Sequence, residues 1–471
     1  KPLSMSLYQK LITDWAWAES RGLCNYKNVF PEPLMFSLGG KPYIDVRNSF
    51  NSFLPLTLSN SISEKLINYS LEYLKKNHEY HDKVEFEVML NCYDFDFDNK
   101  ATSLLNSGFA KPEVEEIRKC YLTFTDELLI SGSCNIKNQL GYFEVLKERR
   151  ESIIGHSGSS ADEIPNQINW LLNDCIKYGI IPFSILARYT FISLILLRSL
   201  ATKKIFSYIE YEIFLKNIPT IGTRFKRDLC IFQRGKISKD IFINKYAHLR
   251  PNSYDICSLN YAMRVERGDF ANGNEGISNF VESDLDISKE LWKEKEDAIA
   301  NVLKENGFTV STHQLFRFIT QSIQAREEGK FEFTKNLNAI LEKVASMGSE
   351  MGFDREDMSY INIEKITRFA TDSPSSVFKT ELKRDINYEK KRHNLTLSLR
   401  LPFLIDSHES FECFDLLKWK PNYITSKKTS GKIVDLSSGA NKVDLVGKIV
   451  LIKGADPGYD WIFSKPIKGI I

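Results

Sequence analysis

Apolar residues recur at every third or fourth position through most of the chain, as far as about residue 395, which predicts a mainly helical fold. Ile62, Leu66, Tyr69 and Tyr73 form one such stripe. Each stripe needs a partner surface, so we expect the helices to pack around a large shared core. The pattern predicts helices over residues 7–17, 61–73, 113–129, 166–200, 206–217, 291–306 and 312–346.

Capping residues and helix breakers predict where several of these helices begin or break. Ser61-Ile62-Ser63-Glu64 has the spacing of a capping box, and a Ser-x-x-Gln sequence that begins at Ser311 caps the last long helix. Pro182 is expected to break the helix in which it lies, because proline has no backbone N–H and clashes with the preceding turn. Gly329 is expected to interrupt the last long helix.

Two regions depart from the helical pattern. Gly39-Gly40 separates two short apolar runs, which predicts a β-hairpin. After residue 401, glycines punctuate short β-type runs at 432–436 and 448–452. The predicted fold class is therefore mainly α with a small β-hairpin element, followed by the truncated start of an α/β domain.

This change of texture also predicts the domain organisation. A helical domain is expected over residues 1–400, a linker over 401–422 and the first part of an α/β domain over 423–471. Fewer than about 50 residues do not make a stable α/β domain, so the last part is expected to be incomplete.

Composition narrows the class of partner. Hydrophobic residues make up 42% of the 471 residues and charged residues 26%, which excludes a disordered or collagen-like chain. The 63 Lys and Arg residues against 61 Asp and Glu give a formal charge of +2. That balance argues against binding nucleic acid or an anionic membrane by bulk charge. A small molecule or another domain is the expected partner.

The cysteines and the most apolar segment predict a cytoplasmic protein. The eight cysteines are scattered and form no CxxC pair, which is typical of a reduced chain without a zinc ribbon. The segment from Ile180 to Leu200 is interrupted by Arg188 and Arg198, and its charge-free run is far shorter than the ~20 residues of a membrane span. We therefore expect a buried helix there and no membrane partner.

The densest polar cluster lies between Lys245 and Asp255. Within it, His248 is a candidate general base, and Arg250 is a candidate group for holding a carboxylate or phosphate. Tyr254 and Asp255 are candidate substrate-binding residues in the same turn. The structural alternative is an ion pair between Arg250 and Asp255, with His248 at the end of a helix.

A second cluster follows the hairpin. Alternation along a strand is expected to place Asp45 and Arg47 on one face, where an acid and a base can hold the ammonium and carboxylate of an amino acid. Asn51 lies in the same cluster. A salt-bridged surface strand is the alternative interpretation.

Three further places carry candidate substrate-binding residues. Lys83 and Glu85 alternate along a run that reads as a solvated strand face. Arg326 and Lys330 form a cationic stretch that can face phosphate, or a solvated helix face. Arg188 lies alone in an apolar helix and must find a carboxylate or a ligand, because burying a lone charge is costly. No spacing of His and carboxylate residues suggests a metal site.

The end of the chain carries the most specific signal. Residues 445–452, 455–464 and 468–471 resemble the swivelling domain of phosphoenolpyruvate-utilising enzymes, directly before the segment that holds their phosphorylated histidine. Residues 245–255 resemble a Tyr-Gly-His element in the acceptor-binding region of such enzymes, with Ala247 in place of the usual glycine. Residues 2–8 and 43–51 resemble one subgroup, the L-glutamine kinases of capsular phosphoramidate biosynthesis.

This resemblance implies an ATP-dependent, dikinase-type phosphotransferase. ATP and Mg²⁺ would bind to an ATP-grasp domain outside these 471 residues, and the fragment would hold no cofactor and be inactive alone. The complete swivelling domain of the same polypeptide would carry phosphohistidine to the helical domain. There the phosphoryl group would pass to a small acceptor, with the amide nitrogen of L-glutamine favoured. Asp45 or Glu85 would hold the α-ammonium group, and Arg47 or Arg188 the α-carboxylate.

Two alternatives remain open from the sequence. The acceptor can be different, for example pyruvate, an antibiotic hydroxyl or a sugar. The helical block can also be a non-catalytic scaffold that only docks the swivelling domain. The scaffold alternative predicts that His248, Arg250 and Asp255 pair with one another in the interior and line no cavity.

Overall fold

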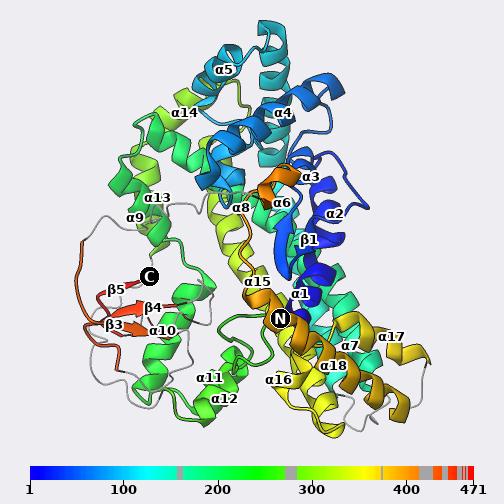
Figure 1. The fold of residues 1–471 in the computed structure, drawn as a ribbon. Coiled ribbons are helices and arrows are strands. Elements are labelled where there is room, and N and C mark those ends of the chain that lie inside the picture. The colour runs from blue at the N-terminus through cyan, green and yellow to red at the C-terminus, as the bar shows by residue number, and fades with distance from the viewer. Residues whose placement is uncertain are drawn as a thin grey trace.

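A computed structural model describes residues 1–155, 163–270, 284–372, 375–412, 428–436, 444–452, 459, 462 and 465–471. The described residues are mainly helical, with a small antiparallel hairpin and a small parallel sheet near the C-terminus, as the sequence predicted (Figure 1). Residues 413–422 of the predicted linker lie outside the described residues.

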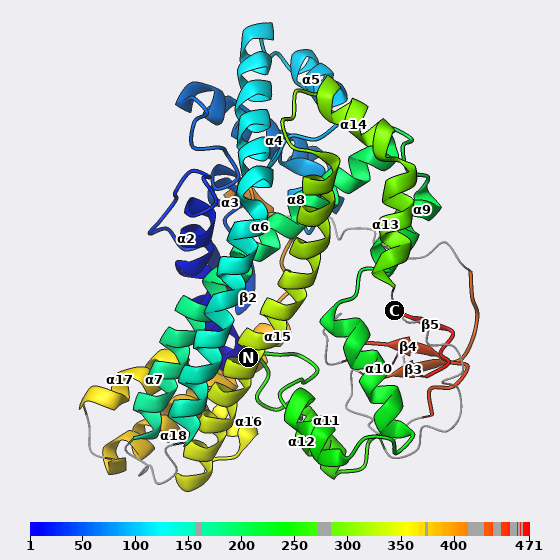
Figure 2. The same ribbon diagram turned by 180° about the vertical axis from the view of Figure 1, so that it is seen from behind.

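Three long helices form the centre of the helical body (Figures 1 and 2): α6 (Lys111–Gly155), α8 (Ile181–Thr202) and α15 (Thr312–Glu350). The capping box predicted at Ser311 is present and begins α15. The one predicted at Ser61 is wrong, because the N-cap of α4 (Asn60–Lys76) is Ser59, two residues earlier.

The shorter elements surround this centre. Before α6 the chain forms α1 (Pro2–Tyr8), η1 (Gln9–Thr13), α2 (Ala16–Gly22), η2 (His78–Tyr80) and α5 (Phe97–Asn106). Between α8 and α15 it forms α9 (Tyr208–Lys216), α10 (Ile221–Gln233), α11 (Lys239–Tyr246), α12 (Tyr261–Glu266), α13 (Leu285–Glu294) and α14 (Glu296–Glu305). After α15 it forms α16 (Arg355–Met358), α17 (Ile363–Asp372), α18 (Ser375–Leu397) and η5 (His408–Phe411).

Glycines let α6 and α15 approach closely. A Cβ atom at Gly329 of α15 would lie 2.7 Å from the ring of Phe143 on α6, and one at Gly132 of α6 would overlap the ring of Phe318 on α15. Gly132 precedes Phe143 on α6, and their partners Phe318 and Gly329 follow in the same order on α15. The two helices therefore run parallel. The predicted interruption at Gly329 is therefore wrong, because this glycine accommodates a neighbouring ring inside a continuous helix.

The apolar segment around Pro182 is one helical run. It passes from α7 (Ile164–Asp174) through the π-helical η4 (Cys175–Ile180) into α8, where Pro182 lies in the first turn and needs no N–H partner. The predicted break is wrong, because the run is continuous through Pro182 and only the type of helix changes before it. Residues 164–202 are long and apolar enough to cross a membrane. However, 61% of their most apolar 18-residue segment is buried inside the protein, and the core helix of a soluble protein can be equally long and apolar.

The hairpin is confirmed, and the cluster that follows it differs from its prediction. Strands β1 (Met35–Leu38) and β2 (Lys41–Ile44) pair across Gly39 and Gly40, which both adopt positive φ. The strand predicted to continue through Asp45 and Arg47 is wrong. Asp45 instead accepts a hydrogen bond from the backbone N–H of Asn48 (2.9 Å) and caps α3 (Val46–Asn51), so the chain turns into a helix.

The strand face predicted at Lys83 and Glu85 is also wrong. Residues Val84–Val88 form η3, a single π-helical turn. Val84 and Val88 both pack against the core, and a spacing of four residues suits one face of a helical turn. The turn leaves Glu85 and Glu87 to form ion pairs with two different arginines of α8.

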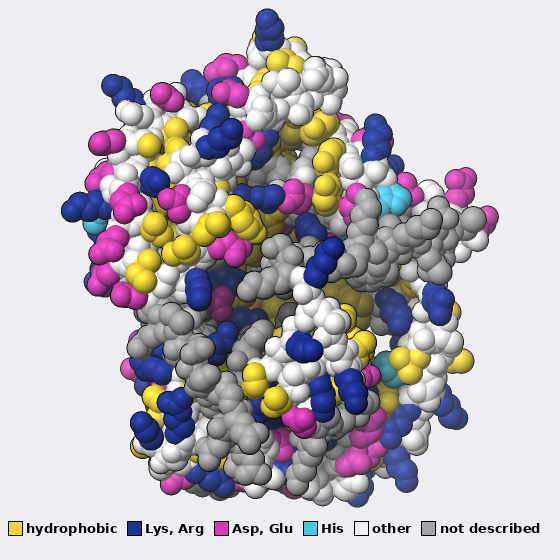
Figure 3. All heavy atoms as spheres, turned by 90° about the vertical axis from the view of Figure 1, so that its left-hand side faces the viewer, with side chains coloured by type: hydrophobic (Ala, Val, Ile, Leu, Met, Phe, Trp, Pro, Cys, Tyr) yellow, Lys and Arg dark blue, Asp and Glu magenta, His cyan; other side chains and the backbone are white. Residues whose placement is uncertain are grey.

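The predicted β-type runs near the C-terminus are confirmed. Strands β3 (Ile433–Asp435), β4 (Ile449–Leu451) and β5 (Gly469–Ile470) form a parallel sheet in that order, over a small apolar core that includes Val450. Figures 1 and 2 show this sheet apart from α15. On the face seen in Figure 3, acidic and basic side chains are interspersed, in keeping with the balanced composition.

We expect Gly329→Ala to lower the free energy of unfolding by about 1–3 kcal/mol, because the new methyl group overpacks the contact with Phe143. Gly141→Ala is the matched control on α6, since a Cβ atom there meets nothing within 4 Å. That substitution should stabilise the protein by about 0.5–1 kcal/mol. Urea unfolding measures both, and equal effects of the two substitutions would contradict the packing argument.

Candidate functional site

Two residues predicted from separate parts of the sequence meet in the structure. The Nη2 atom of Arg188 on α8 lies 2.6 Å from Oε2 of Glu85 on η3. Arg21 of α2, which the sequence analysis missed, places its Nη2 atom 3.4 Å from the other carboxylate oxygen. We call Arg21, Glu85 and Arg188 the Glu85 cluster. The partner that the buried Arg188 required is thus Glu85.

Aromatic rings fix the positions of the guanidinium groups. The guanidinium carbons of Arg21 and Arg188 lie 4.0 and 4.8 Å from the ring centroid of Phe53. Arg188 also lies 4.8 Å from the ring centroid of Phe191, and Arg326 of α15 lies 5.7 Å from the same centroid. Cation–π contacts of this kind are strengthened by burial. The structure therefore brings Arg326, a third predicted residue, to the edge of the Glu85 cluster.

The Glu85 cluster holds more positive than negative charge. Only 4% of the Arg188 side chain and 11% of the Arg21 side chain are exposed, and both share the one carboxylate of Glu85. Burial lowers the pKa of Arg21 to about 10, while Glu85 acts in the opposite direction. Arg21 thus stays protonated at neutral pH, and the cluster is cationic.

Several hydrogen-bond donors around the cluster are unused. Among the described residues, no group accepts a hydrogen bond from Nη1 of Arg188, Nε of Arg326 or Nε1 of Trp17, whose ring lies 5.2 Å from the Arg21 guanidinium carbon. All three atoms are donors only, and unpaired buried donors are costly. Their natural partner is an oxygen-rich anionic group such as a carboxylate or a phosphoryl group.

His248 follows α11 and contacts α15 at Phe331, away from the Glu85 cluster. Its ring packs edge-on against Phe331, with 4.5 Å between centroids, and hydrogen-bonds to the backbone of that residue. Its Nε2 atom has no partner among the described residues. Burial lowers the pKa of His248 well below its ordinary value of 6.5, and the cations of Lys335 and Arg150 lower it further. The imidazole is therefore neutral at pH 7.

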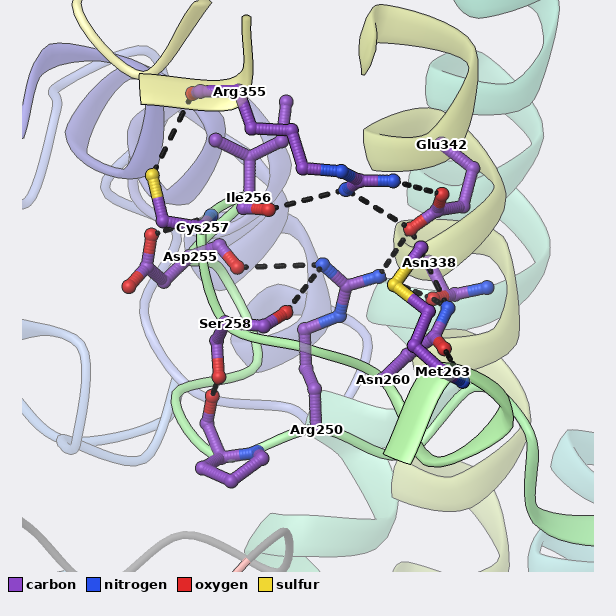
Figure 4. A network of polar contacts seen from close by, with 11 residues as sticks. Arg250, Asp255, Ile256, Cys257, Ser258, Asn260, Met263, Asn338, Glu342 and Arg355 are labelled. Carbon is purple, nitrogen blue, oxygen red and sulfur yellow. Dashed lines mark hydrogen bonds and ion pairs between the residues drawn. The ribbon is translucent and has the colours of Figure 1, made fainter. Parts of the chain in front are cut away.

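Arg250 makes its contacts with protein groups (Figure 4). Its Nη1 atom donates to the backbone carbonyls of Asp255 and Ser258, both at 3.3 Å, and its Nη2 atom contacts Glu342 at 2.9 Å as well as Asn338. These bonds fasten the loop after α11 to α15. The alternative ion pair with the Asp255 carboxylate is not formed, because Glu342 takes that place. The Asp255 carboxylate accepts the backbone N–H of Cys257 instead.

The other predicted residues lie in separate surroundings. Asp45 and Arg47 line an open groove beside the hairpin. Tyr254 packs edge-on against Tyr8, with 5.4 Å between ring centroids. Lys83 precedes η3, Asn51 is the last residue of α3, and Lys330 lies in the middle of α15.

No family model matches this chain, and neither does any curated protein. The described residues also contain no group of three or more His, Cys, Asp or Glu side chains that could hold a metal ion.

We expect Glu85→Gln to lower the free energy of unfolding by about 3 kcal/mol or more, because it leaves two largely buried guanidinium groups without a carboxylate. The matched control is Glu87→Gln on the same turn. Glu87 pairs with Arg198, which is 59% exposed, so that substitution should cost less than about 1 kcal/mol. Urea unfolding measures both, and similar losses would show that Glu85 is no more important than a surface carboxylate.

We expect acid to destabilise the wild type more than His248→Asn. The pKa of His248 is lower in the folded than in the unfolded state. The stability that the neutral imidazole contributes is therefore fully present above about pH 6.5 and is lost as the pH falls and the unfolded state binds a proton. At pH 5 the difference should reach about 2 kcal/mol. Denaturant unfolding at pH 7.5 and pH 5 tests this, since other titrating groups are common to both proteins. Parallel losses would contradict a buried neutral imidazole.

Proposed function

We propose that this chain binds the acceptor in an ATP-dependent, dikinase-type phosphotransferase, and that the acceptor is L-glutamine. The reaction would be ATP + L-glutamine + water → AMP + phosphate + L-glutamine phosphate, in the cytoplasm. The observation that carries the choice of an amino acid is the pairing of Glu85 with Arg188, beside unused donors. The reaction type rests on the resemblance of residues 245–255 and 445–471 to phosphohistidine enzymes.

The Glu85 cluster has the charges that an amino-acid head group requires. A carboxylate of the ligand would accept the unused Nη1 donor of Arg188, and the ammonium group would lie against Glu85. Arg21 would keep Glu85 in place from its other oxygen. A zwitterion adds no net charge to the cluster. Its carboxylate oxygens would accept hydrogen bonds from the unused N–H groups of the arginines.

Transfer to an amide nitrogen needs a base and an anion-binding group. The N–P bond of the phosphohistidine would break, a new bond would form between phosphorus and the amide nitrogen, and that nitrogen would lose a proton. His248 is the proposed base, because its ring is neutral and its Nε2 atom is unused. Arg326 is proposed to face the phosphoryl oxygens. Phe331, which contacts His248, follows Arg326 by five residues on α15, a rise of about 7.5 Å.

A non-catalytic docking scaffold is the second candidate function. The observation that favours it is the set of Arg250 contacts, in which both Nη atoms bond protein groups. Under that proposal the loop after α11 is only a rigid docking element. Pyruvate, a hydroxyl of an antibiotic or a sugar are the alternative acceptors under the enzymatic proposal.

Titration calorimetry with L-glutamine tests the acceptor. We expect Arg188→Gln to weaken binding at least about 10-fold, because it removes a charge-assisted hydrogen bond to the ligand carboxylate. Arg198→Gln on the same helix is the matched control, since Arg198 pairs with Glu87 instead, and it should bind as the wild type does.

Three outcomes would decide against parts of this proposal. Binding of pyruvate in place of L-glutamine would change the acceptor and keep the site. Equal binding by the wild type and Arg188→Gln would remove the Glu85 cluster as the site. Failure to bind any of the acceptors would favour the scaffold.

A further inference from the structure

An open groove of about 1220 Å³ lies beside the hairpin. Its walls are the strands β1 and β2, one side of α4, and residues 399–406. Tyr43 of β2 donates a hydrogen bond to the backbone carbonyl of Pro402, which holds residues 399–406 against the hairpin. None of the residues of the Glu85 cluster lines this groove. The groove is therefore separate from the proposed acceptor site.

The lining of the groove is largely apolar and exposed. Phe36, Ile44 and Phe403 are each about 44–45% exposed, and Leu38 and Leu399 are similar. The strand pairing places Phe36 opposite Tyr43 and Leu38 opposite Lys41, so these four side chains share one face of the hairpin. An apolar surface that stays in contact with water in this way marks a binding site.

Three cations in the lining lack a carboxylate partner. No Asp or Glu among the described residues lies within ion-pair distance of Lys41, Arg47 or Arg400, and Arg47 contacts only an amide oxygen of Asn68, at 3.2 Å. The fourth cation of the groove, Lys75, is by contrast already paired with acidic groups. The lining also contains Asp45, Glu72 and Asp406, so its four Lys and Arg residues exceed its acidic residues by one, and three of the cations form no ion pair with a described residue.

The positions of these cations distinguish between possible ligands. Lys41 begins β2 and Arg47 follows its end, and the strand alone spans about 10 Å. Cations attached at this backbone separation suit two separate anionic groups better than a single one. The volume also exceeds the ~300–1,000 Å³ of typical small-ligand pockets. An elongated ligand with several separated negative charges and apolar groups between them fits better.

We propose that this groove docks an extended segment of a partner protein in which acidic and apolar residues alternate. In an extended chain successive side chains point to opposite sides, so such a segment directs its apolar residues to the walls at Phe36 and Phe403. Its acidic residues then reach Lys41, Arg47 and Arg400 along the rim. Recognition of an extended segment beside a β-hairpin is a known mode of peptide binding.

Fluorescence anisotropy tests this with a labelled nonapeptide of alternating Glu and Leu. The wild type should bind it, and a nonapeptide of alternating Lys and Leu should bind at least 10-fold more weakly. Lys41→Glu with Arg400→Glu should also weaken binding at least 10-fold. The matched control is Lys137→Glu with Lys147→Glu, two exposed positions of α6 with the same change in net charge, which should bind as the wild type does.

A second variant separates docking from non-specific charge attraction. Phe36→Ser with Leu38→Ser keeps every charge and changes two exposed side chains, and it should weaken peptide binding at least 10-fold. Three results would overturn the proposal: no binding of the Glu/Leu peptide, equal loss in the α6 control, or displacement of the peptide by phosphatidylglycerol vesicles that bind more tightly. Calorimetry with L-glutamine is independent of all three, so this proposal and the proposed acceptor site can fail separately.

Discussion

The close contact between α6 and α15 is the constraint on which the rest of the helical body depends. Gly132 and Gly329 each accept a phenylalanine ring from the opposite helix, and neither position has room for a methyl group. The axis of α15 is thereby fixed relative to α6, and α8 packs against both. Arg188 and Phe191 of α8 and Arg326 of α15 then take their positions from one rigid unit. The candidate site inherits its geometry from an apolar contact in the core.

Burial of positive charge is the second constraint. Arg21 and Arg188 have little contact with solvent, and they share one carboxylate instead of having one each. Aromatic rings at Phe53 and Phe191 supply the remaining stabilisation. A buried group of this kind is costly to maintain for stability alone, since apolar residues of similar size fold as well or better. Its excess of donors is the physical reason for assigning it a ligand.

The sequence predicted correctly those elements that a few neighbouring residues determine. The glycine pair of the hairpin and the capping box at Ser311 depend on a few neighbouring residues, and both are confirmed. The strand expected through Asp45 failed because one side-chain cap outweighed an alternating pattern of only a few residues. The helix break expected at Gly329 failed because the reason for that glycine lies 186 positions away in the chain, at Phe143. Distant packing leaves no trace in a local pattern.

The candidate site was predictable to a similar extent. A lone arginine in an apolar helix signalled that Arg188 needs a partner, and the structure supplies Glu85. Nothing in the sequence near Arg21 shows that it reaches the same carboxylate. The only local sign is its place one helical turn after Trp17, whose indole ring it contacts. Which charges meet depends on how η3, α2 and α8 pack, and that is decided by the whole core.

The π-helical segment η4 determines the direction in which each side chain of α8 points around the helix axis. A π-helical turn contains one residue more than an α-helical turn, so it behaves as a single-residue insertion within a helix. Each residue of an α-helix turns the side chains by about 100°. Loss of one residue from Cys175–Ile180 would thus keep α7 and α8 helical and apolar. It would also rotate Arg188 away from Glu85 and Phe53, and separate the two halves of the candidate site without unfolding either of them.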